Sequence, residues 1–275
     1  MASPAPCSGG AGLAQLHDAE RIPGLLQVSG PEAPSAAPAC FFLHIPKTAG
    51  TAVADVLASM FDDKVHHYHT LLRAWGGTLA GVAEALDQDP GLLTRQRAFF
   101  GHMTLQNPMV QRCQGPRLFL SVLRDPVARV VSFYDFIRLN PGHVLQEELL
   151  QTSLLDAFRG NERFRFEVIN AQLRIIFGST EPAQIEARLA SEPHVLGRAT
   201  HLEDFLVAVE AVVGRRRQRP LQRLNLARRD AEVPPASRQP DYAQAVAEIR
   251  AANRAEYAFM RYMPAVLVTR GGRST

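Results

Sequence analysis

Two short segments of the chain carry residues that bind anions. The first, Pro46-Lys47-Thr48-Ala49-Gly50-Thr51, lies between a short apolar run and a helical pattern. Backbone N–H groups point outward at such a turn, and the N-terminus of the next helix adds partial positive charge. Lys47 adds a mobile ammonium, and Thr48 and Thr51 add hydroxyl donors. The pattern is typical of a phosphate-binding loop; the alternative is an ordinary turn with a surface lysine.

Lysine is rare in this chain. Its 30 basic residues comprise 28 arginines and only two lysines, Lys47 and Lys64. A compact, rotatable ammonium that carries a transferable proton suits a leaving oxygen differently from a planar guanidinium. The use of lysine at position 47 therefore favours a chemical role there.

The second segment runs from Arg124 to Ser132, with the sequence RDPVARVVS. Arg124 ends an apolar run, Asp125 can cap a helix and Pro126 suits its first position. A long arginine and a serine two turns into the helix can converge on one anion near the carboxyl edge of a sheet. In the alternative interpretation, Asp125 and Arg129 form a capping ion pair and Ser132 is merely buried.

The elements that must position these residues alternate between strands and helices. Short apolar runs predict strands at 40–45, 98–102, 117–123 and 193–197. Helical spacing follows at 51–61, within 79–86 after a polar loop, and at 126–139, 146–158, 162–176, 183–190, 203–213 and 241–259. Strand, tight loop and helix in succession indicate an α/β fold: three layers, with a central, mostly parallel sheet and helical additions.

The domain boundaries come from composition. Residues 1–39 are rich in Ala, Pro, Gly and Ser and are expected to form a flexible leader, with a short helix near 12–21. One domain is expected over 40–264, followed by a C-terminal tail at 265–275.

Composition also excludes several classes of protein. A net charge of +3 is too small for wholesale nucleic-acid coating, and the three scattered cysteines fit neither a disulfide scaffold nor a zinc ribbon. No apolar run approaches 18 residues, and the N-terminus lacks the order of a secretion signal. We therefore expect a cytoplasmic protein with no transmembrane segment and no nucleic-acid partner.

His44-Ile45-Pro46-Lys47-Thr48-Ala49-Gly50-Thr51, taken with the Arg124–Ser132 segment, resembles sulfotransferase family 2. This group includes the heparan sulfate 2-O-sulfotransferase-like enzymes and bacterial relatives, which use 3'-phosphoadenosine 5'-phosphosulfate (PAPS). The resemblance implies a P-loop-like sulfotransferase fold and PAPS as sulfuryl donor, with no metal required. By the same resemblance, the loop with Lys47, Thr48, Ala49, Gly50 and Thr51 would hold the 5'-phosphosulfate. Arg124 and Ser132 would hold the 3'-phosphate.

Weaker similarities extend over about 40–264. Phe100-Gly101-His102 resembles the Gly-His element of the family, 170–174 its Asn-rich helix, 196–205 its later strand and helix, and 253–257 its closing helix. The residues after His102, at 103–105, depart from the aromatic residue common in relatives. The stretch 225–227 matches the adenine-side loop only loosely, so no adenine contacts are assigned.

The implied reaction is in-line transfer of a sulfuryl group to a hydroxyl, in which positioning and electrostatic clamping dominate. Lys47 would neutralise the charge that develops on the bridging oxygen. His102 is the candidate base, and a satisfied loop histidine is the alternative. His44 competes for the same role. The acceptor is expected to be a hydroxyl compound, either a glycan or glycolipid by family analogy or a small molecule.

Two further clusters stay ambiguous. Lys64 to His69 contains three histidines and is interpreted as a polar loop near the acceptor mouth rather than a metal site. The segment 215–229 contains seven arginines and is expected to be a solvated loop, with a landing site for an anion as the alternative.

Two other functions compete with sulfuryl transfer. A P-loop kinase would need Lys after the last glycine of its loop, but Lys47 precedes Gly50, while Asp125 could imitate a magnesium-holding aspartate. A nucleotide- or glycan-binding protein without turnover is the other alternative. The sequence gives no oligomeric state.

Overall fold

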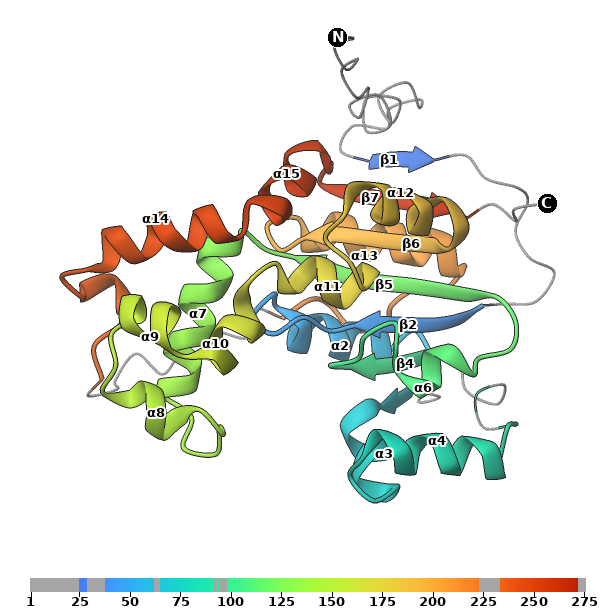
Figure 1. Cartoon of the computed structure of the whole chain (residues 1–275). Coiled ribbons are helices and arrows are strands. Elements are labelled where there is room, and N and C mark those ends of the chain that lie inside the picture. Colours follow the sequence, from blue (N-terminus) through green and yellow to red (C-terminus); the bar gives the residue numbers. More distant parts are fainter. Residues whose placement is uncertain are drawn as a thin grey trace, which may run out of the picture.

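A computed structural model describes residues 25–28, 38–61, 65–91, 93, 98–222 and 233–271. The described strands form one seven-stranded sheet in the order β1-β7-β6-β5-β2-β4-β3 (Figure 1). β6 and β7 are antiparallel, and every other neighbouring pair is parallel. The strands are β1 (Leu25–Val28), β2 (Ala39–Leu43), β3 (Val65–His67), β4 (Ala98–Gly101), β5 (Arg117–Leu123), β6 (Pro193–Arg198) and β7 (Val266–Arg270).

Helices cover both faces of the sheet and build a separate helical lobe. α2 (Gly50–Ala58) and α13 (Leu202–Val213) share a core with one face. The other face is covered by α3 (Tyr68–Ala74), α4 (Leu79–Gln88), α6 (Pro108–Gln111), α11 (Ala171–Phe177), α12 (Pro182–Ser191) and α15 (Arg254–Tyr262). The lobe, at the left of Figure 1, contains α7 (Pro126–Arg138), α8 (Gln146–Leu150), α9 (Leu154–Gly160), α10 (Glu162–Val168) and α14 (Tyr242–Ala252).

The central strands are mostly apolar because both faces of the sheet are buried. In β2, Phe42 joins the core under α2 and α13, whereas Phe41 and Leu43 join the core on the opposite face. Parallel strands buried on both sides lack the polar–apolar alternation of a half-exposed strand. The expected α/β architecture of three layers, with a mostly parallel sheet and helical additions, is confirmed.

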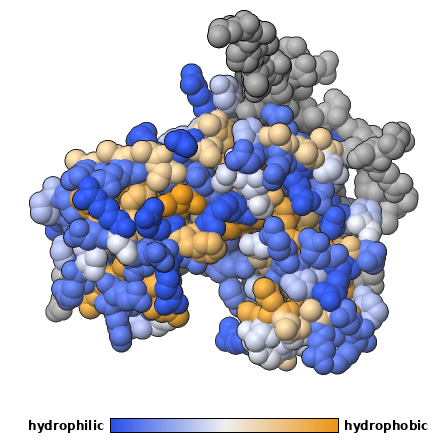
Figure 2. Space-filling model, in the orientation of Figure 1, coloured by the Kyte–Doolittle hydropathy of each residue, from blue (hydrophilic) through white to orange (hydrophobic). Residues whose placement is uncertain are grey.

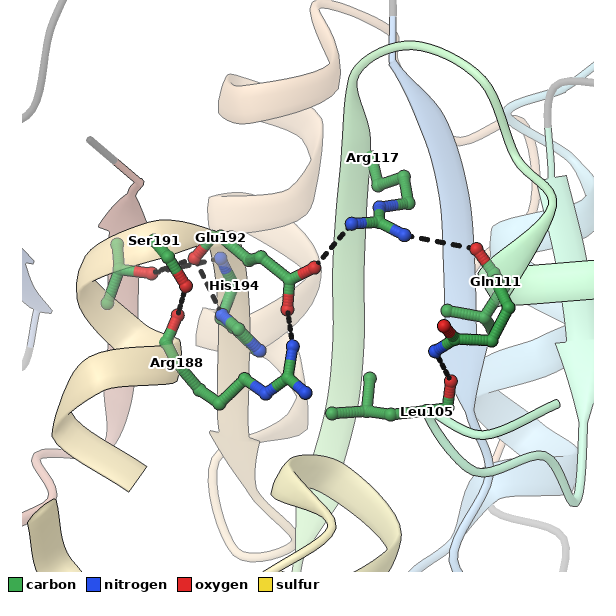
Figure 3. A network of polar contacts seen from close by, with 9 residues as sticks. Leu105, Gln111, Arg117, Arg188, Ser191, Glu192 and His194 are labelled. Carbon is green, nitrogen blue, oxygen red and sulfur yellow. Dashed lines mark hydrogen bonds and ion pairs between the residues drawn. The ribbon is translucent and has the colours of Figure 1, made fainter. Parts of the chain in front are cut away.

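A polar network joins the strands at the edge of the sheet where β5 begins (Figure 3). The Glu192 carboxylate accepts hydrogen bonds from Arg117, at 2.7 Å, and from Arg188, at 3.3 Å. Its backbone carbonyl is 2.8 Å from Nδ1 of His194 and accepts the Thr269 hydroxyl at 3.2 Å. This network therefore fastens α12, β5, β6 and β7 together at the edge opposite to the carboxyl end of β5.

Two strands of the sheet lie outside the domain expected at 40–264. β7 lies inside the predicted tail at 265–275, and pairs with β6 from Val266 to Arg270. β1 lies inside the predicted leader at 1–39 and pairs in parallel with β7. The predicted helix near 12–21 falls outside the described residues.

Four internal predictions also differ from the structure. The helix predicted over 146–158 divides into α8 and α9, and the helix predicted over 162–176 divides into α10 and α11. The segment predicted as a polar loop contains the edge strand β3 and the start of α3, while Lys64 itself is outside the described residues. The helix predicted over 241–259 divides into α14 and α15 at Asn253. The Asn253 side chain is buried there, and accepts a hydrogen bond from the backbone of Asn170 at 2.7 Å.

Among the described residues, no helix has the length and apolar character needed to cross a bilayer.

Candidate functional site

The loop between β2 and α2 has an unusual backbone. Lys47 and Ala49 both have positive φ, 69° and 68°, a conformation that costs a non-glycine residue about 1–2 kcal/mol. Ala49 precedes α2 and supplies no side-chain cap, and no side chain of the described residues accepts from the N–H groups of the first turn. A strained loop ahead of an uncapped helix N-terminus forms a cradle suited to an anion.

Gly50 is required by the close packing of this loop. A Cβ at this position would lie 1.9 Å from Cδ2 and 2.1 Å from Nε2 of His44. The His44 ring therefore lies directly against the first residue of α2. Thr48 is buried, and its hydroxyl donates to the carbonyl of Ile45 at 2.9 Å. Contrary to expectation, that hydroxyl braces the loop and does not face outward, whereas Thr51 is exposed.

Lys47 and Arg124 lie side by side, as the strand register requires. Arg124 Nη1 donates to the carbonyl of Lys47 at 3.0 Å. Burial lowers the pKa of Lys47, and the neighbouring guanidinium lowers it further. Within the described part of the chain, no carboxylate forms an ion pair with either group. Burial lowers the pKa of Arg124, and the nearby Asp125 carboxylate opposes that shift. Two half-buried cations outside any ion pair make this edge of the sheet attractive to an anion.

α7 carries Ser132, the last of the predicted anion-binding residues. The Lys47 ammonium lies 4.3 Å from the centre of the Phe136 ring, in a cation–π contact. Ser132 precedes Phe136 by four residues, and therefore lies on the same face of α7. Ser132 is half-buried, and its hydroxyl forms no hydrogen bond to any of the described residues. Its hydroxyl is thus available on the side of the helix that faces Lys47.

The side chain of Gln172, on α11, binds the backbone of Arg124. The Gln172 side chain accepts from the Arg124 N–H and donates to its carbonyl, both at 2.9 Å. The same amide donates to the Glu256 carboxylate at 2.6 Å, and Glu256 also accepts the backbone N–H of Gln172 at 2.7 Å. The side chains of Gln172 and Glu256 are both fully buried. Gln172 and Glu256 therefore position Arg124.

Three histidines gather beside the loop. Leu43 pairs with Gly101, so the next residues, His44 and His102, are neighbours at the carboxyl ends of β2 and β4. Their rings stack with centroids 4.4 Å apart, and His69 of α3 lies edge-on to His102 at 5.2 Å. α3 comes this close because a Cβ at Gly101 would lie 2.6 Å from that of Tyr68.

A hydrogen bond to a backbone carbonyl determines the tautomer of the His102 ring. Its Nδ1 lies 2.8 Å from the carbonyl of His44, which only accepts, so Nδ1 carries the proton. The neutral ring then presents its lone pair on Nε2. Burial lowers the pKa of His102, although this hydrogen bond opposes the shift. Burial and the neighbouring His102, His69 and Lys47 lower the pKa of His44 to about 3. The pKa of His69 is lowered as well, mainly by burial and then by the neighbouring His102.

A pocket of about 470 Å³ opens next to His102. His44 and Pro46 line it on the loop side, and α10 and α11 close it opposite through Phe166 and Arg174. Figure 2 shows this face of the molecule hollowed between the helical lobe and the side that carries α3 and α4. The pocket and the cation pair both adjoin this loop, the pocket through His44 and Pro46 and the pair through Lys47.

Two residues of the second signature are structural. Asp125 caps α7 through Ala128 at 2.8 Å, and its other oxygen accepts the Tyr257 hydroxyl at 3.0 Å. Arg129 is fully buried and donates to the carbonyls of Glu167 and Val168. With both oxygens of Asp125 engaged, the likeness to a magnesium-holding aspartate has no support in the geometry.

The other clusters noted in the sequence make ring contacts and ion pairs within the protein. His66 and His67 contact Phe99 and Phe100, and among the described residues no group of His, Cys, Asp or Glu is arranged to hold a metal. In the Arg-rich segment, Arg219 pairs with Asp55 at 2.8 Å. Arg217 pairs there with Glu203 at 2.7 Å and Glu210 at 3.5 Å. Residues 223–229, including the stretch compared with an adenine-side loop, lie outside the described residues.

Gln172, Glu256 and His69 belong to the site but were not predicted from the sequence. The first two belong to segments whose resemblance to the family was noted, but no local pattern indicated that they meet at Arg124. His69 was assigned to a loop near the acceptor mouth, and the structure places it on α3 against His102.

No family model and no curated protein sequence matches the chain. Among solved structures, mouse sulfotransferase SULT7A1 complexed with PAP is similar, with 14% sequence identity and a TM-score of 0.36. The alignment covers 66% of this chain and 60% of the mouse chain, so less than two thirds of that protein is matched. A likeness this weak carries no weight for function, which must be inferred from the site itself.

Proposed function

We propose that this chain is a sulfotransferase that moves the sulfuryl group of PAPS to an acceptor hydroxyl. The single observation that carries the proposal is the pair of half-buried cations, Lys47 and Arg124, which form no ion pair within the described residues and lie beside the uncapped N-terminus of α2. A nucleotide with phosphates at both its 3' and 5' positions supplies the anions that this edge of the sheet lacks.

Each residue of the site then has a role toward the donor. The N–H groups of Ala49 and Gly50, with exposed Thr51, hold the 5'-phosphate, and Thr48 contributes its backbone N–H. Arg124 and Ser132 bind the 3'-phosphate. Lys47 moves from the Phe136 ring to the bridging oxygen as negative charge develops there.

The reaction balances as a displacement at sulfur. The bond from sulfur to the bridging oxygen of PAPS breaks, and its electron pair stays on the 5'-phosphate, while the acceptor oxygen forms a new bond to sulfur. His102 takes the proton of the acceptor hydroxyl on Nε2, which its hydrogen bond to His44 leaves free. His44, with a pKa of about 3, is the weaker base of the two near neutral pH. A sulfate ester and adenosine 3',5'-bisphosphate (PAP) are the products.

The experiment that tests the proposal is incubation with radiolabelled PAPS and a mixed cell extract, with mass spectrometry of whatever gains sulfate. The wild type should produce a labelled ester. Lys47→Arg keeps the charge but replaces the ammonium by a planar guanidinium, and should bind PAP within about tenfold of the wild type while losing turnover. His102→Ala should also bind PAP and lose turnover. No affinity for PAP in the wild type would refute the proposal.

A binding protein without turnover is the second candidate. It has the same donor site but no working base, and would bind PAP tightly while sulfating nothing. The free Nε2 of His102 at the pocket favours the enzyme over this candidate.

A further inference from the structure

The pocket beside His102 has features that select a particular class of acceptor. It has a volume of about 470 Å³, within the range for a small organic ligand, and most of its lining is apolar. Met103 and Ile175 contribute apolar wall, and Phe166, 67% exposed, stands at the pocket with its ring open to solvent.

The charges around the pocket cancel. Its lining contains one arginine, Arg174, and one carboxylate, Glu167, among residues that are otherwise uncharged. Both lining histidines, His44 and His102, have pKa values below the ordinary value, so they are neutral near pH 7. A chain of sulfated sugars or uronates would bring several negative charges to walls that offer no surplus of cations.

Arg174 is already engaged. Its guanidinium donates to the carbonyl of Ile169 at 3.3 Å and to that of Phe166, and lies 4.4 Å from the centre of the Phe166 ring. These contacts cap the end of α10 and hold the Phe166 ring in place. Arg174 therefore acts as a brace for the aromatic wall and is not free to recognise an anionic acceptor.

We infer that the acceptor is a compact, uncharged alcohol or phenol whose apolar ring packs on Phe166 and whose hydroxyl reaches Nε2 of His102. The inference rests on the proposed sulfotransferase function and goes beyond it by selecting among acceptors. It disfavours an anionic glycan, because the lining offers Thr104 and Gln106 as hydrogen-bonding groups but no cation other than the engaged Arg174, and most of its surface is apolar.

The test compares 2-naphthol, 6-hydroxy-2-naphthoate and desulfated heparin as acceptors for labelled PAPS. We expect 2-naphthol to be sulfated, and the added carboxylate to lower kcat/KM at least tenfold, with no transfer to the glycan. Phe166→Ala should raise KM for 2-naphthol about three- to thirtyfold, with kcat and the affinity for PAP unchanged. Val144→Ala is the matched control, because Val144 is an exposed apolar side chain of the same lobe, 73% exposed, that does not line the pocket.

Calorimetry with PAP separates the two proposals. If PAP binds but the carboxylate or the glycan is the better acceptor, or if no compound of the panel is sulfated, the inference about the acceptor is wrong and the donor site stands. The same holds if Phe166→Ala leaves KM for 2-naphthol unchanged. If PAP does not bind, the proposed function itself fails.

Discussion

Replacement of Gln172 by leucine tests whether the backbone of Arg124 must be clamped for the donor to bind. The two side chains are similar in volume, so the substitution removes mainly polar contacts. It deletes two hydrogen bonds to the Arg124 backbone and one to the Glu256 carboxylate. At about 1 kcal/mol for each neutral bond and about 2 kcal/mol for the charged one, the free energy of unfolding should fall by about 4 kcal/mol.

The expected effect on binding is separate from the loss of stability. Glu256 keeps its bond from the backbone of residue 172, so the region should stay folded while Arg124 loses its fixed position. Loss of one charge-assisted contact to the 3'-phosphate weakens PAP binding by about 10- to 150-fold. Urea unfolding gives the stability, and calorimetry at low temperature gives the affinity.

The control for this prediction is Gln244→Ala, since Gln244 is exposed and makes a single weak contact with Glu248. That variant should match the wild type in both measurements. If Gln172→Leu loses stability but binds PAP and 5'-AMP as the wild type does, the clamp has no part in donor recognition and the reasoning is refuted.

Three further predictions concern pH and packing. His194 is fully buried with a pKa of about 4, below the ordinary 6.5, so its stabilising contribution is present above pH 6.5 and is lost as the pH falls toward 4. That loss is about 3 kcal/mol, and urea unfolding should show a shallower pH slope in His194→Phe; an equal slope would contradict the assignment. Because the pKa of His102 is lowered, the acid limb of the kcat/KM profile should lie below pH 6.5; a limb above 6.5 would point to another base. Gly50→Ala should lower the free energy of unfolding by about 1–3 kcal/mol, because the new Cβ clashes with His44. Ala49→Gly relieves a positive φ and should change the free energy of unfolding by less than about 1 kcal/mol. Similar losses in both variants would be evidence against the close packing of Gly50 on His44.

The sequence was most informative where local chemistry marks a boundary. β5 and α7 were predicted almost residue for residue, because an apolar run meets Asp125 and Pro126, which stop the strand and start the helix. β3 was missed because Val65–His67 contains one apolar residue and lies at the edge of the sheet. β7 was mistaken for a tail, since a short apolar run near the end of a chain gives no sign of the strand it will pair with.

The residues proposed to bind the donor could be predicted from the sequence, but the residues that position them could not. Lys47 and Arg124 carry their chemistry in local patterns, and the register of neighbouring parallel strands brings them together. The bonds from Gln172 to Arg124 and to Glu256 join positions 48 and 84 residues apart, and no local spacing encodes such contacts. The same holds for His69, which reaches His102 only because α3 passes closely over Gly101.

Calorimetric titration of the wild-type protein with PAP and with 5'-AMP tests the central claim most directly. The account predicts that PAP binds at least tenfold more tightly, and that Arg124→Gln removes this preference while the exposed control Arg112→Gln keeps it. Equal affinity for the two nucleotides in the wild type would contradict the assignment of Arg124 and Ser132 to a 3'-phosphate, and with it the identification of the donor.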